Sequence, residues 1–570
     1  MLPKTRGGEF LFRDLQPEEI FTPEDLSEEH KDVARAAQEF WNGEVEPHLE
    51  AIAAGDHDAA IAALRKSAEL GLTAILTPEA YGGMEMDLPA AMVVAEQVAR
   101  DGSYAAWHGA HSGIGTTPLV LFGTEDQKRR YLPKLSSAEW IGAYCLSEAH
   151  AGSDALAAKT RAERDGDHYV LNGQKMWITN GGRADLFTVF AKVNGEQFTA
   201  FLVEAAWPGV SRGAEEKKMG IKGSSTCAIY FDNVRVPKEN VLGEIGRGHI
   251  IAFNILNLGR LKLGPFAVGA AKQVLALSLR YARERRAFGS AIAEFGAIRH
   301  KLAEMAIRIF AAESMSWRVV GQVEALLEGF AWSEPDAANR YLKAVEEFAP
   351  ECSMVKVFAS EMLDYVADEG VQIHGGYGYH ADYRVERAYR DSRINRIFEG
   401  TNEINRLLAT GMLLKRAAKG QLDLAGAARK AAEAAMAPAS ADGPENARLV
   451  RQAKQIVLLL MGAAWQRYLT ELDKQQEVLT GITDCMMDAF AMESVWLRAE
   501  RLGGRAADTC DVFLRCAMER IGTAARAVSS ACAEGDALRT QFALLRKLTR
   551  YEPVDVIAAR RRIAAGVLQS

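Results

Sequence analysis

The chain has 570 residues, of which 48% are hydrophobic and 25% are charged, and its net charge is −7. These values are typical of a soluble globular protein with about three or four structural domains. The modest negative charge and the lack of a long basic run argue against nucleic acid as a partner. Seven cysteines form no CxxC pair and no histidines cluster at ligand spacing, so we expect reduced thiols and no metal.

No targeting or membrane-spanning segment is expected. Residues 1–20 lack an apolar stretch and turn acidic quickly, which argues against a signal peptide and a transit peptide. The longest strongly apolar run, Ile456–Trp465, has about half the length that a bilayer span requires. We therefore expect a cytoplasmic protein.

Residues 1–140 have the pattern of a helical domain. Thr22 stands before Pro23 and two acids, which is typical of a helix start, and apolar residues then recur at helical spacing from Val33 to Phe40. His108 and His111 have no carboxylate or cysteine at ligand spacing, so we interpret both as structural.

Residues 141–250 change to an extended pattern. Short β-rich runs are separated by Asn-Gly, Gly-Gly and Pro turns, which predicts a small antiparallel barrel or sandwich. Residues 144–154 are rich in small and hydroxylated side chains, so their backbone N–H groups can approach a flat polar ring or a pyrophosphate. Residues 176–181 end a strand with a large aromatic beside a hydroxyl. Each pattern alone is more often structural than functional.

Helical spacing returns in residues 251–415, with a break at residues 285–289 and a new helix after Phe295. The glycine-rich residues 372–379 do not follow a strand, so they are not a dinucleotide-binding fingerprint of the βαβ kind. Residues 416–570 have the pattern of an all-helical extension, with a plausible linker at residues 438–444.

Glu399 is a single carboxylate between an apolar pair and the sequence Gly400-Thr401, which can open a new helix. A desolvated acid would then lie beside exposed backbone N–H groups, which is an arrangement suited to a general base. The alternative is an ordinary helix end followed by a helix start, and this segment alone favours that alternative.

Six segments, taken in order, resemble the acyl-CoA dehydrogenase family. They are YCLSEAHAGSD, NGQKMWITNGG, KKMGIKGSSTCAIYFDNVRVPKENVLG, RRAFG, QIHGGYGY and RIFEGTNEINR, and they lie within residues 25–415. Six segments in register are far more specific than any one of them. The C-terminal extension and the segment NILNLGR make the chain most similar to the very-long-chain branch.

The resemblance implies a fold with a helical domain, a β domain and a second helical domain. It also implies FAD as cofactor and 2,3-dehydrogenation of long-chain fatty acyl-CoA to trans-2-enoyl-CoA, the first step of fatty-acid β-oxidation, with electrons passed to an electron-transfer flavoprotein. Two alternatives stay open: an acyl-CoA oxidase that uses oxygen, and a low-turnover assembly or scaffold protein on the same fold. The presence of Glu399 and of every flavin segment argues against the scaffold.

The resemblance also assigns roles to individual residues. Glu399 takes the position of the catalytic base, and Gly259 stands where the isovaleryl-type branch carries its own acid. Substrate contacts are implied for Ser153, Arg260 and Gly400, although Arg260 could instead cover apolar surface with its stem. Cofactor contacts are implied for Tyr144, Leu146, Ser147, Ser153, Trp177, Ile178, Thr179, Arg285, Phe288, Gln372, Gly375, Gly376, Thr401, Asn402 and Glu403. The contacts from residues 285–288 and 372–376 come from the neighbouring subunit of a homodimer. Phe295-Gly296 replaces a His-Gln pair that is frequent in the family, so no contact is assigned there.

Small residues in the stretch 111–123 predict the length of the acyl chain. Gly113 and Gly115 would leave room in a packed wall, whereas Pro118 departs from the very-long-chain pattern. Each buried methylene adds about 0.8 kcal/mol of binding, so we expect a preference for chains of about C12 or longer.

The charge is segregated along the chain. Residues 411–570 carry 23 Lys and Arg against 18 Asp and Glu, a net charge of +5, whereas residues 1–410 carry −12. Leucines 413, 414, 422 and 424 alternate with basic residues, which is suited to peripheral contact with an anionic membrane on its inner face. The alternative is a solvated helix and linker. By family resemblance, the extension would also cover apolar surface and keep the protein a homodimer.

Overall fold

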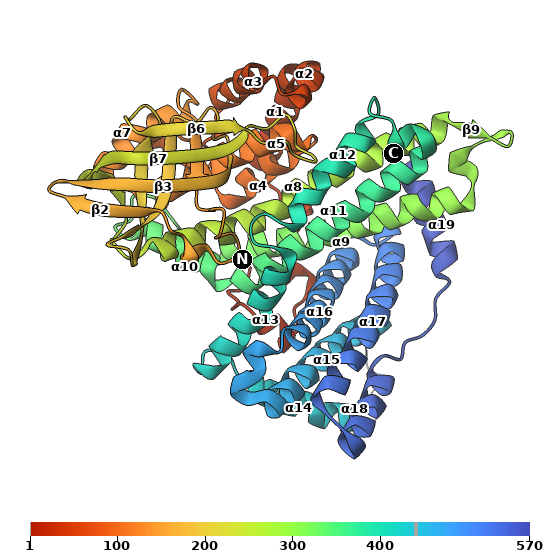
Figure 1. Cartoon of the computed structure of the whole chain (residues 1–570). Coiled ribbons are helices and arrows are strands. Elements are labelled where there is room, and N and C mark those ends of the chain that lie inside the picture. Colours follow the sequence, from red (N-terminus) through yellow and green to blue (C-terminus); the bar gives the residue numbers. More distant parts are fainter. Residues whose placement is uncertain (1, 438–442, 570) are drawn as a thin grey trace.

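The computed structural model describes residues 2–437 and 443–569. Figure 1 shows the sheet on one side of a bundle of long helices, and a second group of helices that packs below this bundle. The order along the chain is helical, β, helical, helical, which confirms the predicted fold class.

Seven α-helices precede the β domain in the described part of the chain. Ser27 caps the first of them, because its Oγ accepts a hydrogen bond from the His30 backbone N–H at 3.2 Å. The predicted start at Thr22 is present, but only as the short 3₁₀ helix Pro23–Asp25, in which Asp25 accepts from the Thr22 N–H at 2.8 Å, and the α-helix begins later, after Ser27. The helices are α1 (Glu28–Phe40), α2 (Leu49–Ala54), α3 (His57–Glu69), α4 (Leu88–Val98), α5 (Gly102–Gly109), α6 (Thr117–Phe122) and α7 (Glu125–Ser136).

An eight-stranded sheet forms the β domain within the described residues. Its strands are β1 (Gly142–Cys145), β2 (Arg161–Asp165), β3 (His168–Thr179), β4 (Leu186–Val193), β5 (Gln197–Glu204), β6 (Val210–Glu215), β7 (Thr226–Pro237) and β8 (Val241–Leu242). The order is β6-β7-β3-β2-β4-β5-β8, with β1 on β4. The sheet is not purely antiparallel, because β1 and β2 both pair with β4 in parallel. Strands joined by long connections, rather than by hairpin turns, can pair in this direction.

Long helices dominate the second helical domain, and they are α8 (Gly248–Glu284), α9 (Gly296–Leu326), α10 (Ala337–Glu347), α11 (Ala349–His374), α12 (Arg384–Ser392) and α13 (Asn402–Ala418). The predicted break after α8 is a two-stranded hairpin, β9 (Arg286–Ala287) and β10 (Ser290–Ala291). Phe288 and Gly289 form its turn with φ angles of 51° and 84°, a conformation that glycine tolerates and other residues rarely adopt.

The C-terminal extension is helical, as predicted, and its helices are α14 (Leu424–Met436), α15 (Glu445–Tyr468), α16 (Gln476–Leu502), α17 (Arg505–Cys532), α18 (Gly535–Leu548) and α19 (Val556–Gln569). Most of the predicted linker, residues 438–442, lies outside the described residues. Helix α16 packs against α9 and α13, and α19 returns to lie along α9.

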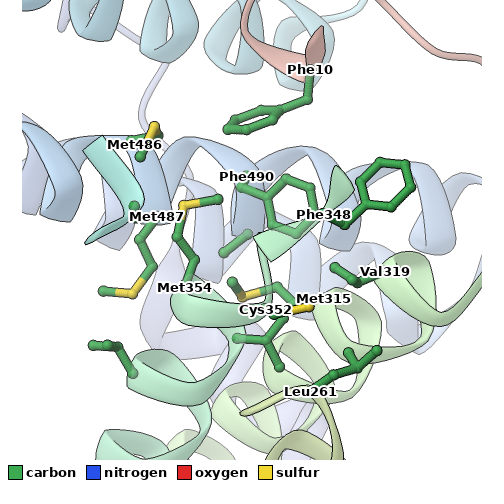
Figure 2. Close-up of a cluster of buried hydrophobic side chains, with 14 of the residues drawn as sticks. Phe10, Leu261, Met315, Val319, Phe348, Cys352, Met354, Met486, Met487 and Phe490 are labelled. Atoms are coloured by element: carbon green, nitrogen blue, oxygen red, sulfur yellow. The ribbon is translucent and has the colours of Figure 1, made fainter. Parts of the chain in front are cut away.

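The N-terminal segment joins this extension to the helical domain. Figure 2 shows Phe10 from this segment in one cluster with Phe490 and Met486 of α16 and with Leu261 of α8. The rings of Phe10 and Phe490 meet edge to face, with centroids 4.9 Å apart. The core therefore continues from the extension to the helix that follows the β domain.

A buried group of charges links the same elements. Glu493 of α16 binds Arg318 of α9 at 2.7 Å through one carboxylate oxygen and Lys454 of α15 through the other. Lys454 also donates to the carbonyl oxygen of Arg13 at 2.9 Å. All three side chains are almost fully buried, with exposures of 1% for Glu493, 0% for Arg318 and 4% for Lys454.

The structure contradicts the predicted membrane contact. Leu413, Leu422 and Leu424 have exposures of 0%, 6% and 5%, so they belong to the core rather than to an outward apolar face. Gly8 of the N-terminal segment lies directly against the side chains of Leu413 and Leu422. The interpretation of this stretch as a membrane-lying amphipathic surface is therefore wrong. Among the described residues, no helix combines the length and the apolar character that crossing a bilayer requires.

Candidate active site

Glu399 lies in a strained turn between a 3₁₀ turn (Arg393–Arg396) and α13. Its φ angle is 56° and that of Gly400 is 79°, so two consecutive residues adopt the left-handed conformation. Thr401 then caps α13, because its Oγ1 accepts from the Ile404 N–H at 3.3 Å. The predicted helix end and helix start are both present, and between them the turn projects the carboxylate inward.

Buried side chains hold this turn by its carbonyl groups. Arg260 Nε donates to the Glu399 carbonyl oxygen at 3.1 Å, and Asn405 Nδ2 donates to the same oxygen at 3.2 Å. Lys356 Nζ donates to the Gly400 carbonyl oxygen at 2.8 Å. Arg260 is 5% exposed, so the alternative in which its head reaches the surface is wrong. The strained conformation is thereby fixed before any ligand binds.

The Glu399 carboxylate itself is desolvated. Its Oε2 is buried without a hydrogen-bond partner, and burial raises its pKa to about 7, although the charges of Arg260 and Lys356 oppose this rise. Gly259 makes room for it, since a Cβ there would lie 2.7 Å from Glu399 Oε2. A carboxylate held in this state can take a proton from a ligand near neutral pH.

We expect Gly259→Ala to displace the carboxylate. The added Cβ would meet all three terminal atoms of Glu399 at 3.0 Å or less, so the turn must shift. A displacement of about 1 Å lowers a rate by about 100-fold, which steady-state kinetics would show as a loss in kcat. Gly411→Ala on α13 is the control, because a Cβ there meets nothing within 4 Å. Wild-type kcat in Gly259→Ala would contradict the role assigned to this space.

An apolar cavity of about 210 Å³ opens beside Glu399. It runs between α4, α5, α8 and α12 and the short π-helical segment Ala110–Gly115. Gly113 lines it, as predicted. Gly115 does not, and its predicted role is wrong: a Cβ there would lie 2.7 Å from the Gly142 backbone, so this glycine permits close packing on β1.

The two predicted flavin segments lie side by side. The Met176 N–H donates to the Ser147 carbonyl oxygen at 2.9 Å, and Thr179 reaches the wall of the cavity. A bulge in β3 between Lys175 and Ile178 gives Trp177 a φ of 61° and leaves its ring 57% exposed. Tyr144 is buried and its hydroxyl has no partner, whereas Ile178 is buried in the sheet core. Ser153 lies on an exposed loop outside the cavity wall.

A buried ion pair that we did not predict fixes this arrangement. Lys175 Nζ binds Glu148 Oε1 at 2.7 Å and donates to the Leu146 carbonyl oxygen at 3.1 Å. Lys175 is fully buried because it occupies an inward position of β3. The role of Lys356, which donates to the Gly400 carbonyl oxygen, was also not predicted from the sequence. A lysine inside the apolar run CSMVKVFAS of α11 is the signal that could have found it.

Asn402 and Glu403 have different environments although both follow the base. Asn402 is buried, and its amide is bonded to Lys356, Ser360 and Glu361. Glu403 is exposed, and hydrogen bonds from its own backbone and from Thr401 lower the pKa of its carboxyl. The cofactor contacts assigned to both, and to Thr401, stay predictions.

The remaining predicted cofactor residues form a separate surface group. Phe288 is 98% exposed at the tip of the β9–β10 hairpin, and Arg285 lies over the Tyr377 ring with a guanidinium-to-centroid distance of 5.7 Å. Gln372, Gly375 and Gly376 are exposed in the neighbouring turn. Gly259 and Arg285 are separated by roughly 39 Å along α8, at 1.5 Å per residue. This group therefore does not belong to the pocket of Glu399 within one chain.

A desolvated carboxylate beside an apolar cavity is an arrangement that can take a proton from a ligand with an apolar chain, as an enzyme would require. Four family descriptions match the chain: acyl-CoA dehydrogenase N-terminal domain at residues 27–139, middle domain at 143–234, and two of the C-terminal domain at 246–414 and 452–547. The chain belongs to the acyl-CoA dehydrogenase family, and it is an oxidoreductase.

Individual relatives agree with this assignment. A probable acyl-CoA dehydrogenase of Bacillus subtilis (strain 168) is 46% identical, with 99% of this chain and 98% of that protein covered. The very long-chain specific acyl-CoA dehydrogenase of Bos taurus is 44% identical over 52% of this chain and 45% of its own. The crystal structure of an acyl-CoA dehydrogenase complexed with FAD from Bacillus anthracis has a TM-score of 0.97, with 46% identity over 99% of both chains. Butyryl-CoA dehydrogenase from Megasphaera elsdenii has a TM-score of 0.62 and 34% identity over 68% of this chain and 99% of its own.

Proposed function

We propose that the protein is an FAD-dependent dehydrogenase that converts long-chain fatty acyl-CoA to trans-2-enoyl-CoA and passes the electrons to an electron-transfer flavoprotein. The observation that carries this proposal is the Glu399 carboxylate, which is unpartnered, raised in pKa to about 7 and open to an apolar cavity. Glu399 Oε2 takes the proton from the carbon next to the thioester. Closure of the cavity around an acyl chain excludes water and keeps the carboxylate basic.

The residues near Glu399 fit FAD. Thr179 lines the cavity, Trp177 is exposed two residues before it, and the unpartnered Tyr144 hydroxyl is close enough to Glu399 for their charges to interact. When bound there, FAD supplies an acceptor for the hydride that leaves the next carbon of the acyl chain. In residues 2–437 and 443–569, the Glu399 backbone N–H has no protein acceptor, so it can bind the thioester carbonyl oxygen as negative charge develops.

A homodimer is supported by the separation of the two groups of predicted cofactor residues. Because roughly 39 Å of α8 separates Arg285 from Gly259, we assign residues 285–288 and 372–376 to the cofactor of a second copy. The C-terminal extension packs on α9 and α13 and so covers apolar surface of the helical domain. A cytoplasmic address stays a prediction.

The absorption spectrum of the purified protein tests this function directly. We expect flavin absorption that bleaches when acyl-CoA is added without air, and slow oxygen uptake when the same mixture is aerated. Rapid oxygen uptake would instead identify an oxidase. Flavin that keeps its colour with acyl-CoA of every length would reject catalysis and leave the scaffold interpretation.

Chain length is tested at Gly113. A Cβ at this position would have only Lys262 Nζ near it, at 4.0 Å, so a larger side chain would extend into the cavity. We expect Gly113→Phe to exclude about three methylene groups and lower kcat/KM for long chains by about 50-fold, at about 0.8 kcal/mol per methylene. Short chains should be unaffected. Gly113→Ala is the matched control, and equal losses for all lengths would contradict the placement of the acyl chain.

A further inference from the structure

Lys262 extends into the interior of the acyl cavity. It lies on α8 three residues after Gly259, about 4.5 Å further along the helix axis, so it faces the same side as the space occupied by Glu399. Its Nζ donates to Ser112 Oγ at 3.0 Å and lies 5.7 Å from the centre of the Phe266 ring. Among the described residues, the side-chain partner of this ammonium group is the Ser112 hydroxyl, and no carboxylate charge offsets its desolvation.

A second and smaller cavity, of about 30 Å³, adjoins the first. Lys262 and Ser112 line both, so their hydrogen bond lies at the boundary between them. The walls of the smaller cavity include two buried polar atoms without partners, His108 Nδ1 and Tyr341 Oη. At Lys262 the cavity beside Glu399 therefore adjoins a smaller chamber, whose mainly apolar wall carries these few polar groups.

The charge of this chamber is positive. No Asp or Glu lines it, and the acids whose charges act on Tyr341 are Glu324 and Asp87. Burial raises the pKa of Glu324 to about 7, and Asp87 is bonded to His30. Burial lowers the pKa of His111 to about 4, and it lowers the pKa of His108 well below its ordinary value, so both are neutral near pH 7. Lys262 is the cation that lines the chamber.

A plain alkyl chain satisfies none of these groups. Burial lowers the pKa of Lys262 to about 8, so the ammonium form still prevails at pH 7 although it is desolvated. A methyl end placed beside it would remove the remaining space for water and leave the charge unpaired. A carboxylate would accept from the ammonium group of Lys262 and from the unpartnered hydroxyl of Tyr341, whereas the Ser112 hydroxyl already donates to the His108 carbonyl oxygen at 2.8 Å.

We propose that Lys262 binds a carboxylate at the far end of the acyl chain, so that the protein accepts CoA monothioesters of dicarboxylic acids. This inference rests on the proposed function, because the thioester end must lie at Glu399. Lys262 thereby selects substrates whose length brings the second carboxylate to the chamber. Shorter diacids would place that charge in the apolar passage, where it is unfavourable.

Pairs of substrates with equal chain length, one ending in methyl and one in carboxylate, test this inference in wild-type enzyme and in Lys262→Met. At the length that reaches the chamber, the wild type should favour the carboxylate. Lys262→Met should lower the carboxylate-to-methyl ratio of kcat/KM by about 10- to 100-fold, the usual effect of losing a hydrogen bond between charged groups. Lys262→Arg keeps a cation and should retain part of the preference.

The pH dependence gives a second measurement that needs no variant. The carboxylate-to-methyl ratio should fall as pH rises through about 8, because Lys262 then loses its proton while a terminal carboxylate stays ionised. A wild-type ratio of one or less at every length would overturn the inference, and so would a ratio unchanged in folded Lys262→Met. In either case, bleaching by the methyl-ended substrates would leave the proposed function intact. If neither series bleaches the flavin, the proposed function itself fails.

Discussion

Glu399→Gln is expected to retain FAD and to bind acyl-CoA, but to reduce its flavin slower by a factor on the order of thousands, as the loss of a general base should. The amide has nearly the same shape, and the Oε2 position that it alters has no hydrogen-bond partner to lose. The carbonyl contacts from Arg260 and Asn405 involve the backbone and should persist. The turn should therefore keep its conformation while the proton acceptor is removed.

Stopped-flow measurement of flavin bleaching gives this rate. In the wild type, kcat/KM should rise with pH through about 7 and then level off, because the raised pKa means that Glu399 is protonated and inactive below this value. The variant should lack this step. Glu433→Gln on the exposed face of α14 is the control for loss of a carboxylate elsewhere. A wild-type rate in Glu399→Gln would show that another group is the base.

Glu493→Gln is expected to destabilise the junction between the C-terminal extension and the helical domain by about 3–5 kcal/mol, the range found when one partner of a buried ion pair is removed. Arg318 and Lys454 would keep their charges in the core with a neutral amide between them. Arg318 is fully buried, whereas Lys454 would keep a second contact, at 3.3 Å, with the exposed Asp14. The effect should exceed that of any surface substitution on these helices.

Hydrogen exchange measured by mass spectrometry would locate the change. Amides of α15 and α16 should exchange faster in the variant, whereas those of the β domain should keep their wild-type rates. Asp536→Asn is the control, because its pair with Arg539 is exposed on α18 and contributes little. Unchanged protection of α15 and α16 would mean that the three charges do not hold the extension in place.

Much of the fold follows from local patterns in the sequence. The hairpin at residues 285–291 needs a left-handed residue in its turn, and Gly289 supplies it. Thr401 caps α13 with its own side chain. The alternation of inward residues in the first half of β3 is a property of that strand. Such features depend on residues a few positions apart, and for that reason the element order and the position of Glu399 were predictable.

Tertiary packing decided what these elements do together. Gly259 and Glu399 are 140 positions apart. Only the folded structure, in which α8 passes next to the turn, shows that the carboxylate occupies the space that a side chain at position 259 would fill. Gly113 and Gly115 have the same local pattern, yet one lines a cavity and the other lies against the Gly142 backbone.

The same distinction explains the wrong interpretation of the basic, leucine-rich stretch at the end of α13 and just after it. Its sequence determined that it has leucines on one side and cations on the other, but not what covers the leucines. Gly8, some 400 positions earlier, covers Leu413 and Leu422. The sequence by itself determined the helices, the strands, the family resemblance and the carboxylate in its strained turn, because these depend on neighbouring residues. The burial of that carboxylate, the cavity beside it and the placement of Lys262 depend on contacts between distant segments, which only the folded structure brings together.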